Sequence, residues 1–410
     1  MLPINRFWRK AIYCGLALAM GSTLAGANDW PDGRVCLTIR TDPTFDGFLQ
    51  SPMRRSDNWL RTYVWRMMVY SPFFDKKLEF FPNGWAYINL YGVHKDWSGV
   101  TEHPEWLLRD SAGNPLYVPY DCANGTCPLY AADVSNAQYR ANWLATAKSL
   151  VSKGYRGLWI DDVNMEFRVS DGNSRPVAPI DRNTGRPMLY DDWKRYVADF
   201  TTQIRTALPG AELLHNAIWY AGGPNRDADG NVKRQLLSAD YINIERGVAD
   251  SGLTGGNGPW SMRALLDYVD RLHAMGKGVI MDNTKRLGEY GLAAYFLISN
   301  GGDGVGSHDI APGVIPREFG IDLGPSTGAR TYSQGLFRRE FQRGLVYLNE
   351  PGAPVVSPKV CDGCIRVDGS PAAGLTLRGG EAAILMRSDQ NFQPFQYPRT
   401  RDRCVAPPLR

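Results

Sequence analysis

The stretch that decides the fold is Gly157-Leu158-Trp159-Ile160-Asp161-Asp162. Its side chains alternate as in a strand, with Leu158 and Ile160 on one face and Trp159 and Asp161 on the other. The apolar pair would contact covering helices, so Asp161 would point into the interior of a sheet or barrel. The strand therefore predicts an acidic site at its carboxyl end.

Seven further short apolar segments alternate with helical segments along the chain. Strands that alternate with helices predict a parallel sheet, and eight of them predict a closed (β/α)8 TIM barrel. An open doubly wound sheet is the alternative, but no glycine-rich phosphate-binding loop follows the first strand. The eight expected strands are 34–41, 85–91, 129–133, 156–161, 211–216, 241–245, 277–282 and 304–307.

Three of the intervening helices have a clear apolar face. Residues 191–208 form one of them, and Pro209-Gly210 stops it. A second is expected over 136–153. A third covers 261–275 and begins at Ser261, whose hydroxyl suits an N-cap.

The alternation of strands and helices ends near residue 344. Short β segments broken by Gly and Pro follow it, and they predict a small antiparallel domain. We expect the barrel over 28–343, a small β-sandwich-like domain over 344–390 and a Pro-rich tail over 391–410.

Residues 1–27 have the features of a secretory signal peptide: a basic start, an apolar run too short to span a bilayer, and Ala25-Gly26-Ala27 as small residues for cleavage. A membrane anchor is the alternative. This segment carries three of the four net positive charges. The remaining chain is therefore nearly neutral and lacks the excess of positive charge that indicates nucleic-acid binding. We expect export to the periplasm or exterior of a bacterial cell, without stable membrane insertion, and leave the oligomeric state open.

The cysteines fit an oxidising compartment. Of the seven, Cys14 lies in the signal segment, and the remaining six are an even number. Six cysteines allow fifteen pairings, so the connectivity stays open. A redox or zinc role for the single C-x-x-C is the alternative. The local pairings we favour are Cys122–Cys127 and Cys361–Cys364, which leaves Cys36–Cys404 to tie the tail to the first strand.

Nearly every expected strand ends in a side chain that can form hydrogen bonds. The carboxyl ends of barrel strands form the active face, although an Asp at such a place is equally typical of a helix cap or a turn. The residues expected to contact a ligand at these ends are Asp42, Tyr91, Asp133, Asp162, Asn216, Trp219, Arg246, Asp282 and His308.

Two of the acidic residues form a candidate catalytic pair. Glu245 alternates with Ile244 on its strand, so it points inward, two strands away from Asp161. Paired carboxylates suit glycoside hydrolysis, in which one attacks or stabilises the anomeric carbon and the other protonates the leaving oxygen. Repulsion and burial would raise the pKa of one of them. The structural alternative is a buried ion pair of Glu245 with Arg40 or Arg246.

Aromatic residues in the loops after the strands would supply flat surfaces for sugar rings, and they favour a groove for an extended glycan. They include Trp97, Trp219 and Trp260. No metal or cofactor is expected, because the five His form no H-E-x-x-H pair and the calcium-loop-like start at Asn225 has Leu236 where a Glu is needed.

The segments HPEWLLRDSAGNPLYV (103–118), LYAADVSNAQYRANWL (129–144) and GYRGLWIDDVNME (154–166) resemble glycoside-hydrolase-like barrels. They most resemble the group called hypothetical glycosyl hydrolase family fifteen, and the resemblance extends over about residues 34–390. Related α-glucosidase-type barrels are retaining enzymes with their nucleophile at the Asp of G-[IF]-W-x-D, which corresponds here to Asp161. Glu245 follows as acid/base only from its strand position, and no substrate is implied.

These observations leave three hypotheses. The first is a retaining glycoside hydrolase acting on a bacterial extracellular polysaccharide, with Asp161 and Glu245 as its catalytic residues. The others are a noncatalytic glycan-binding barrel associated with exopolysaccharide export and a transglycosylase. Loss of hydrolysis with retained binding in Asp161→Asn and Glu245→Gln would separate catalysis from binding.

Overall fold

The computed structural model describes residues 33–40, 64–79, 81–217, 226–249, 252–283, 288–307 and 320–387. The expected signal segment and Pro-rich tail lie outside these ranges, as do the candidate site residues Asp42, Trp219 and His308. Within the ranges, no helix is long and apolar enough to span a bilayer.

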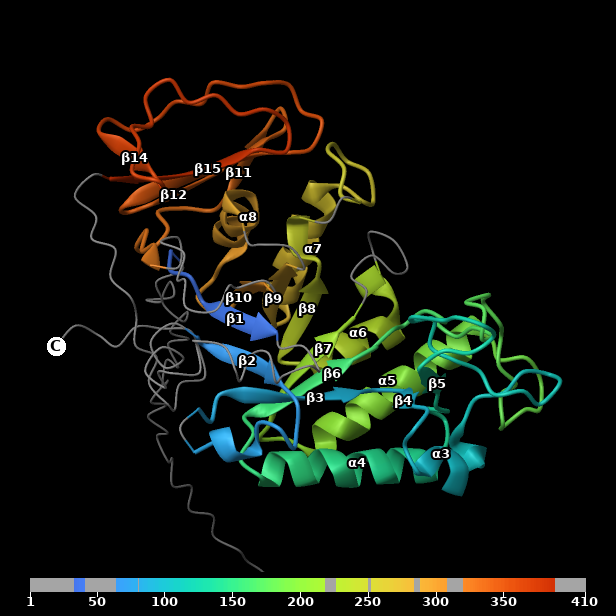
Figure 1. Cartoon of the computed structure of the whole chain (residues 1–410). Helices are drawn as coiled ribbons and strands as arrows, with labels where there is room; N and C mark the ends of the chain where they lie inside the picture. Colours follow the sequence, from blue (N-terminus) through green and yellow to red (C-terminus); the bar gives the residue numbers. More distant parts are fainter. Residues whose placement is uncertain are drawn as a thin grey trace, which may run out of the picture.

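Eight parallel strands close into a barrel, which confirms the predicted (β/α)8 architecture (Figure 1). Each strand pairs with its spatial neighbours in parallel. In spatial order the strands are β1 (Leu37–Arg40), β10 (Gly304–Ser307), β9 (Gly278–Asn283), β8 (Tyr241–Glu245), β7 (Glu212–Asn216), β6 (Gly157–Asp161), β3 (Gly84–Asn89) and β2 (Arg66–Val69).

One barrel strand differs from the sequence-based expectation. The strand expected over 129–133 is wrong, because Leu129–Ala131 forms β5, which pairs antiparallel with β4 (Gly92–His94) outside the barrel. The barrel is instead completed by β2, Arg66–Val69, which lies between β1 and β3. The sequence analysis did not predict β2, because a charged residue at its start is not typical of a buried strand. Arg66 is nevertheless fully buried, in an ion pair with Glu212 inside the barrel.

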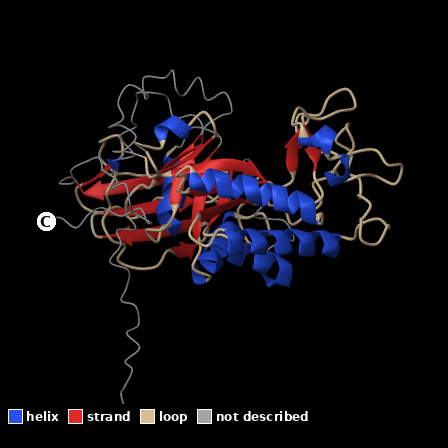
Figure 2. Ribbon diagram, turned by 90° about the horizontal axis from the view of Figure 1, so that it is seen from below, coloured by secondary structure: helices blue, strands red, loops and turns tan. Residues whose placement is uncertain are grey.

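Helices cover the outside of the barrel (Figure 2). The three predicted helices are confirmed to within one residue as α4 (Ala137–Ser152), α5 (Tyr190–Ala207) and α7 (Met262–Ala274). The Ser261 hydroxyl caps α7 as expected. Other helical elements that the sequence analysis did not delimit include α6 (Gly230–Ser238), α8 (Glu289–Ile298) and the short η2 (Asp75–Lys77), η4 (Arg226–Ala228) and η5 (Gly247–Ala249).

Large and small side chains alternate inside the barrel and fill its lower part. Rings of Trp65, Trp85 and Tyr241 meet there at centroid distances of 5.5 to 6.2 Å. Gly278 on the adjacent strand β9 is in register with Tyr241 and leaves room for its ring, since a Cβ there would come within 2.7 Å of that ring. Because the lower interior is filled, a ligand can enter the barrel only at the carboxyl ends of the strands.

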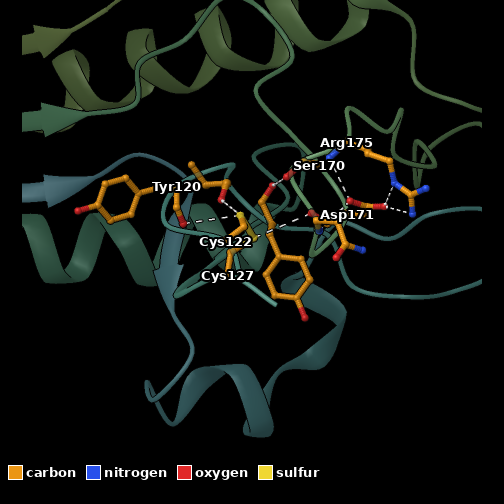
Figure 3. Close-up of a disulfide and its surroundings, with 9 residues drawn as sticks. Tyr120, Cys122, Cys127, Ser170, Asp171 and Arg175 are labelled. Atoms are coloured by element: carbon orange, nitrogen blue, oxygen red, sulfur yellow. Dashed lines mark hydrogen bonds and ion pairs between the residues drawn. A yellow bond between two sulfur atoms is a disulfide. The ribbon is translucent and has the colours of Figure 1, made fainter. Parts of the chain in front are cut away.

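A lobe extends from the side of the barrel on which the strands end (Figure 1). It consists of β4, α3 (Gly99–Glu102), η3 (Pro104–Trp106), β5 and the segment after β6. The predicted Cys122–Cys127 disulfide is confirmed in this lobe, where it lies beside Asp171 (Figure 3).

A five-stranded antiparallel sheet follows the barrel and confirms the predicted small β domain. One face packs against α8 and joins the barrel core, while the other covers a second cluster around Leu345, Leu377 and Leu385. The expected boundary at 343–344 falls inside the hairpin of its second and third strands. In spatial order these strands are β11 (Thr331–Ser333), β12 (Leu336–Phe341), β13 (Gly344–Asn349), β15 (Ala382–Arg387) and β14 (Cys364–Arg366).

The two remaining cysteine expectations have different outcomes. The predicted Cys361–Cys364 disulfide is confirmed beside β14. Cys36 is also disulfide-bonded, whereas Cys404, its expected partner, lies outside the described residues.

Candidate active site

Asp161 and Glu245 end two barrel strands that are separated only by β7. The amide of Asn216, at the end of β7, lies between them. Its Nδ2 donates to Asp161 Oδ1 at 2.8 Å and to Glu245 Oε2 at 3.2 Å. These two distances limit the separation of the two carboxylate oxygens to about 6 Å. The carboxylates therefore face the same space at the barrel mouth.

The Asn216 amide is held by its neighbour on β8. Asn243, fully buried, donates from Nδ2 to Asn216 Oδ1 at 2.9 Å. Because the oxygen of the amide is occupied, its nitrogen is directed at the two carboxylates. This contact fixes the spacing of the pair from inside the barrel.

Three donors surround the Asp161 carboxylate. Besides Asn216, the Tyr87 hydroxyl donates to Oδ2 at 2.8 Å and the Asp162 N–H donates to Oδ1 at 2.9 Å. Burial and the Asp161 charge raise the pKa of Tyr87 well above its ordinary value, so its hydroxyl stays protonated and remains a donor. The three bonds stabilise the negative charge on Asp161 and fix its orientation.

Glu245 forms an ion pair with Arg40 but is not sealed from solvent. Arg40 Nη1 lies 2.9 Å from Glu245 Oε1, and the Glu245 side chain is 43% exposed. The ion pair of Glu245 with Arg40, given above as the structural alternative, is therefore present, but it is not buried, because the Glu245 carboxylate is open to water.

Arg40 forms a second ion pair through the same nitrogen atom. Its Nη1 lies 3.0 Å from Oδ2 of Asp282, which is buried, and its guanidinium lies 5.8 Å from the centroid of the Trp159 ring. Burial alone would lower the pKa of Arg40, but the charges of Asp282, Glu245 and Asp161 together raise it. Arg40 is therefore permanently charged, and one cation faces three carboxylates.

Asp162 lies on the other side of Asp161. Its carboxylate accepts hydrogen bonds from Asn89 Nδ2 at 2.7 Å and from Asn164 Nδ2 at 3.0 Å. Burial, and next the charge of Asp161, raise the pKa of Asp162 to about 7. At neutral pH this carboxyl group is partly protonated, in contrast to an exposed aspartate.

The raised pKa of Asp162 predicts how Asp162→Asn changes stability with pH. A carboxyl whose pKa is higher in the folded state binds more protons there, so wild-type stability falls as pH rises from about 4 to about 7. Asparagine cannot ionise and lacks this loss. We expect Tm of the variant relative to wild type to rise by several degrees between pH 5 and pH 8 in thermal melts. A constant difference across this range would contradict the assignment.

Both candidate catalytic residues are followed by strained backbone. Asp162 has φ 53° and Arg246 has φ 68°, in the left-handed region that disfavours non-glycine residues. Such conformations cost about 1 to 3 kcal/mol each and cluster at functional sites. Here they turn the chain sharply at the strand ends, directly after Asp161 and Glu245.

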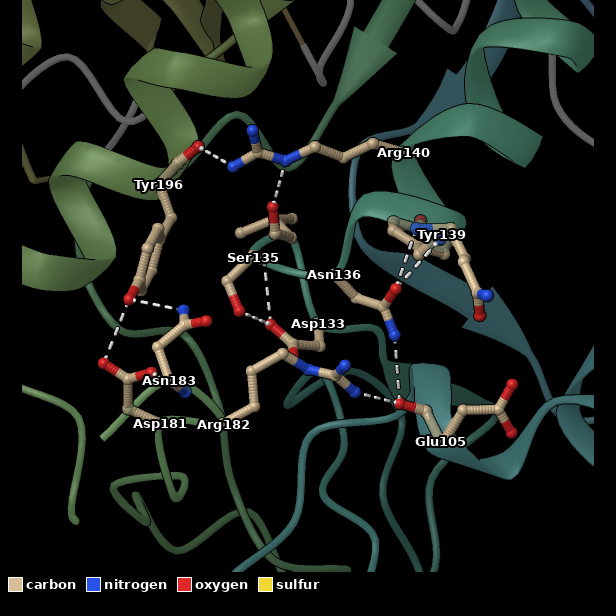
Figure 4. Close-up of polar contacts among 12 residues, drawn as sticks. Glu105, Asp133, Ser135, Asn136, Tyr139, Arg140, Asp181, Arg182, Asn183 and Tyr196 are labelled. Carbon is tan, nitrogen blue, oxygen red and sulfur yellow. Dashed lines mark hydrogen bonds and ion pairs between the residues drawn. The ribbon is translucent and has the colours of Figure 1, made fainter. Parts of the chain in front are cut away.

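Two other predicted ligand contacts lie elsewhere. Tyr91 is fully buried under the segment after β6, and its hydroxyl donates to the Arg168 carbonyl at 3.3 Å. The expectation that Asp133 ends a barrel strand is wrong. Its carboxylate accepts from the Ser135 N–H and pairs with Arg182 at 2.6 Å, so it organises a turn of the lobe (Figure 4).

Sequence reasoning assigns no role in the site to Tyr87 or Asn243. It gives Arg40 only as a polar residue at the end of the first strand and as a possible ion-pair partner of Glu245. The alternation of Trp85, Tyr87 and Asn89 on β3 carries a signal for Tyr87, since Asn89 is in register with Asp161. No group of three or more His, Cys, Asp or Glu suited to a metal ion occurs in the described part of the chain.

No family model and no curated protein matches the chain by sequence. Among solved structures, the fold is similar to the glycoside hydrolase domain of PelA from Pseudomonas aeruginosa, with 16% identity over 67% of this chain and 94% of that one and a TM-score of 0.38. It is also similar to an alpha-galactosidase from Thermus thermophilus (14% identity, 75% and 65% coverage, TM-score 0.45) and to a maltogenic alpha-amylase from Thermotoga neapolitana (12% identity, 90% and 99% coverage, TM-score 0.45).

These structural neighbours are glycoside hydrolases, and they do not confirm the resemblance to family fifteen.

Proposed function

We propose that this protein is a retaining glycoside hydrolase in which Asp161 is the nucleophile and Glu245 the acid/base. The shared Asn216 amide carries the proposal, because it holds the two carboxylate oxygens within about 6 Å of each other. Retaining enzymes place their carboxyl groups about 5 to 5.5 Å apart, whereas inverting enzymes need about 6.5 to 9.5 Å to admit a water molecule.

Asp161 suits the nucleophile because its three donors fix the orientation of its carboxylate before substrate arrives. In the first step, a proton moves from Glu245 to the glycosidic oxygen as the bond between that oxygen and the anomeric carbon breaks. An Asp161 oxygen then forms a bond to the anomeric carbon. In the second step, Glu245 takes a proton from water, whose oxygen attacks the same carbon and releases Asp161.

The charge of the site suits the transition state of this reaction. With the proton of the first step on Glu245, the Arg40 guanidinium faces the carboxylates of Asp161 and Asp282, so these three groups still carry excess negative charge. Glycoside cleavage passes through an oxocarbenium-like transition state, in which positive charge develops at the sugar ring. Fixed negative charges at the mouth stabilise that charge more than they stabilise the neutral substrate.

We further propose that the substrate is a bacterial extracellular polysaccharide and that the protein is exported. The signal-like segment supports export, and the Cys122–Cys127 and Cys361–Cys364 disulfides fit an oxidising compartment. Trp260, on the loop between β8 and α7, is 47% exposed, and a partly exposed indole suits stacking against a sugar ring.

The experiment is to incubate the wild-type protein with bacterial exopolysaccharides and nitrophenyl glycosides, and to follow the first-formed product by proton NMR. We expect hydrolysis with retention of anomeric configuration. Inversion would contradict the role of Asp161 as nucleophile. Glycan binding without hydrolysis would instead favour a noncatalytic barrel, and transfer to added sugar acceptors in place of water would favour a transglycosylase.

A further inference from the structure

Asp282 competes with Glu245 for the same guanidinium nitrogen. Arg40 Nη1 lies 2.9 Å from Glu245 Oε1 and 3.0 Å from Asp282 Oδ2. The two acids differ in exposure, since the Asp282 side chain is 3% exposed and that of Glu245 is 43% exposed. They are in register on the adjacent strands β8 and β9. The three side chains therefore form one unit at the barrel mouth.

An isolated Arg40–Glu245 pair would be a poor source of protons. A cation next to a carboxyl group stabilises its ionised form, so the proton is lost at lower pH. The buried carboxylate of Asp282 changes this balance, because a charge pair interacts more strongly when water is excluded. Asp282 draws on the same positive charge and leaves less of it for Glu245.

We propose that Asp282 is a positioning residue that holds the Arg40 cation and shares its charge, so that Glu245 can carry the proton needed by the leaving group. The inference rests on the proposed function and adds a residue to it. Asp282 acts through Arg40, whose guanidinium also lies over Trp159 at 5.8 Å.

Other charges also act on Glu245. Asp161 disfavours its ionisation, as Asp282 does, while the cation Arg40 favours it. Changing Asp282 to asparagine keeps the shape and removes one negative charge. In the described part of the chain, the groups around Glu245 are Arg40 from β1, Asp282 from β9, Asp161 from β6, the neutral Asn216 from β7 and Arg246 directly after it.

The test compares Asp282→Asn with Arg40→Gln. In a retaining hydrolase, loss of the acid's proton sets the alkaline limb of the kcat/KM profile. We expect this limb to move to lower pH in Asp282→Asn, on the order of one pH unit, and to higher pH in Arg40→Gln. The probe is a glycoside with a poor leaving group that wild type cleaves, because its departure requires the proton of the acid. A purely structural role for Asp282 would not produce shifts in opposite directions.

A second readout does not depend on activity. In protein with ¹³C-labelled Glu carboxyl groups, the Glu245 signal is identified by its absence in Glu245→Gln, and its titration midpoint is followed in each variant. A folded Asp282→Asn with both the limb and the midpoint at wild-type pH would overturn the inference. Should that variant not fold, Arg40→Gln decides, with an unmoved midpoint as the contradicting result.

The matched control is Asp227→Asn, which removes a carboxylate that pairs with Arg271 at 2.9 Å on the outside of the barrel. Both limbs should stay in place in this variant. The two proposals fail differently. If wild type cleaves no glycoside, the proposed function fails, while the titration of Glu245 still tests the role of Asp282.

Discussion

Asp161→Asn should reduce glycoside hydrolysis on the order of 10⁴-fold or more, because catalytic residues that act as a unit lose most of their effect together. Asparagine preserves the size of the side chain and contacts to Tyr87 and Asn216, but it cannot form the bond to the anomeric carbon. Substrate binding should remain within about tenfold of wild type. Initial rates of sugar release and calorimetric titration with the same glycan measure the two effects.

Glu245→Gln should lose about 10² to 10⁴-fold on natural glycans, the usual contribution of a general acid. For nitrophenyl glycosides with very good leaving groups, the rate of the first step should fall much less in Glu245→Gln, because these leaving groups depart without a proton. Asp199→Asn is the control, because this exposed carboxylate on α5 pairs with Arg234 on α6, outside the barrel. Equal losses on good and poor leaving groups would contradict the role of Glu245 as acid.

The largest effect on stability is expected from Glu212→Gln. Glu212 lies at the start of β7 inside the barrel and accepts four hydrogen bonds. Arg66 donates two of them, at 2.8 and 2.9 Å, Trp85 Nε1 donates one at 2.7 Å and Arg156 Nε donates one at 2.9 Å. A glutamine amide would turn an NH₂ group toward two of these donors and leave buried Arg66 without its full counter-charge. We expect a loss of about 3 to 5 kcal/mol in the free energy of unfolding.

The sign of the pH dependence follows from the pKa of Glu212. Burial alone would raise it, but Arg66 and Arg156 lower it below its ordinary value. The stabilisation is therefore present above the unfolded pKa, near 4.3, and is lost as pH falls through the lower folded value. Urea unfolding should show the full difference at pH 7 and a smaller one below pH 4. A loss under about 1 kcal/mol at pH 7, as expected for the exposed pair in Asp199→Asn, would contradict this account.

The sequence predicted the barrel because most of its strands are apolar runs that end in polar residues. It missed β2 because Arg66 breaks the run, and its partner Glu212 lies 146 positions away. Conversely, residues 129–133 are apolar because they pack within the lobe, which local pattern cannot distinguish from a barrel strand. Long-range pairing, which decides both cases, leaves no signal in a short window of sequence.

The candidate pair could be placed because period-two alternation fixes which side chains of β6 and β8 point inward. Alternation cannot give distances, so the amide bridge of Asn216 and the sharing of Arg40 between Glu245 and Asp282 emerged only from the structure. Asp133 shows the converse limit. An acidic residue after an apolar run is equally a turn residue, and here it binds Ser135 and Arg182.

The most direct test is to trap the covalent intermediate. The protein is incubated with a 2-deoxy-2-fluoro glycoside bearing a good leaving group, because fluorine slows the second step more than the first, and the product is digested and mapped by mass spectrometry. We predict one added sugar on the peptide containing Asp161, and none in Asp161→Asn. A sugar on another residue, or turnover with inversion and no adduct, would contradict the pairing of Asp161 and Glu245.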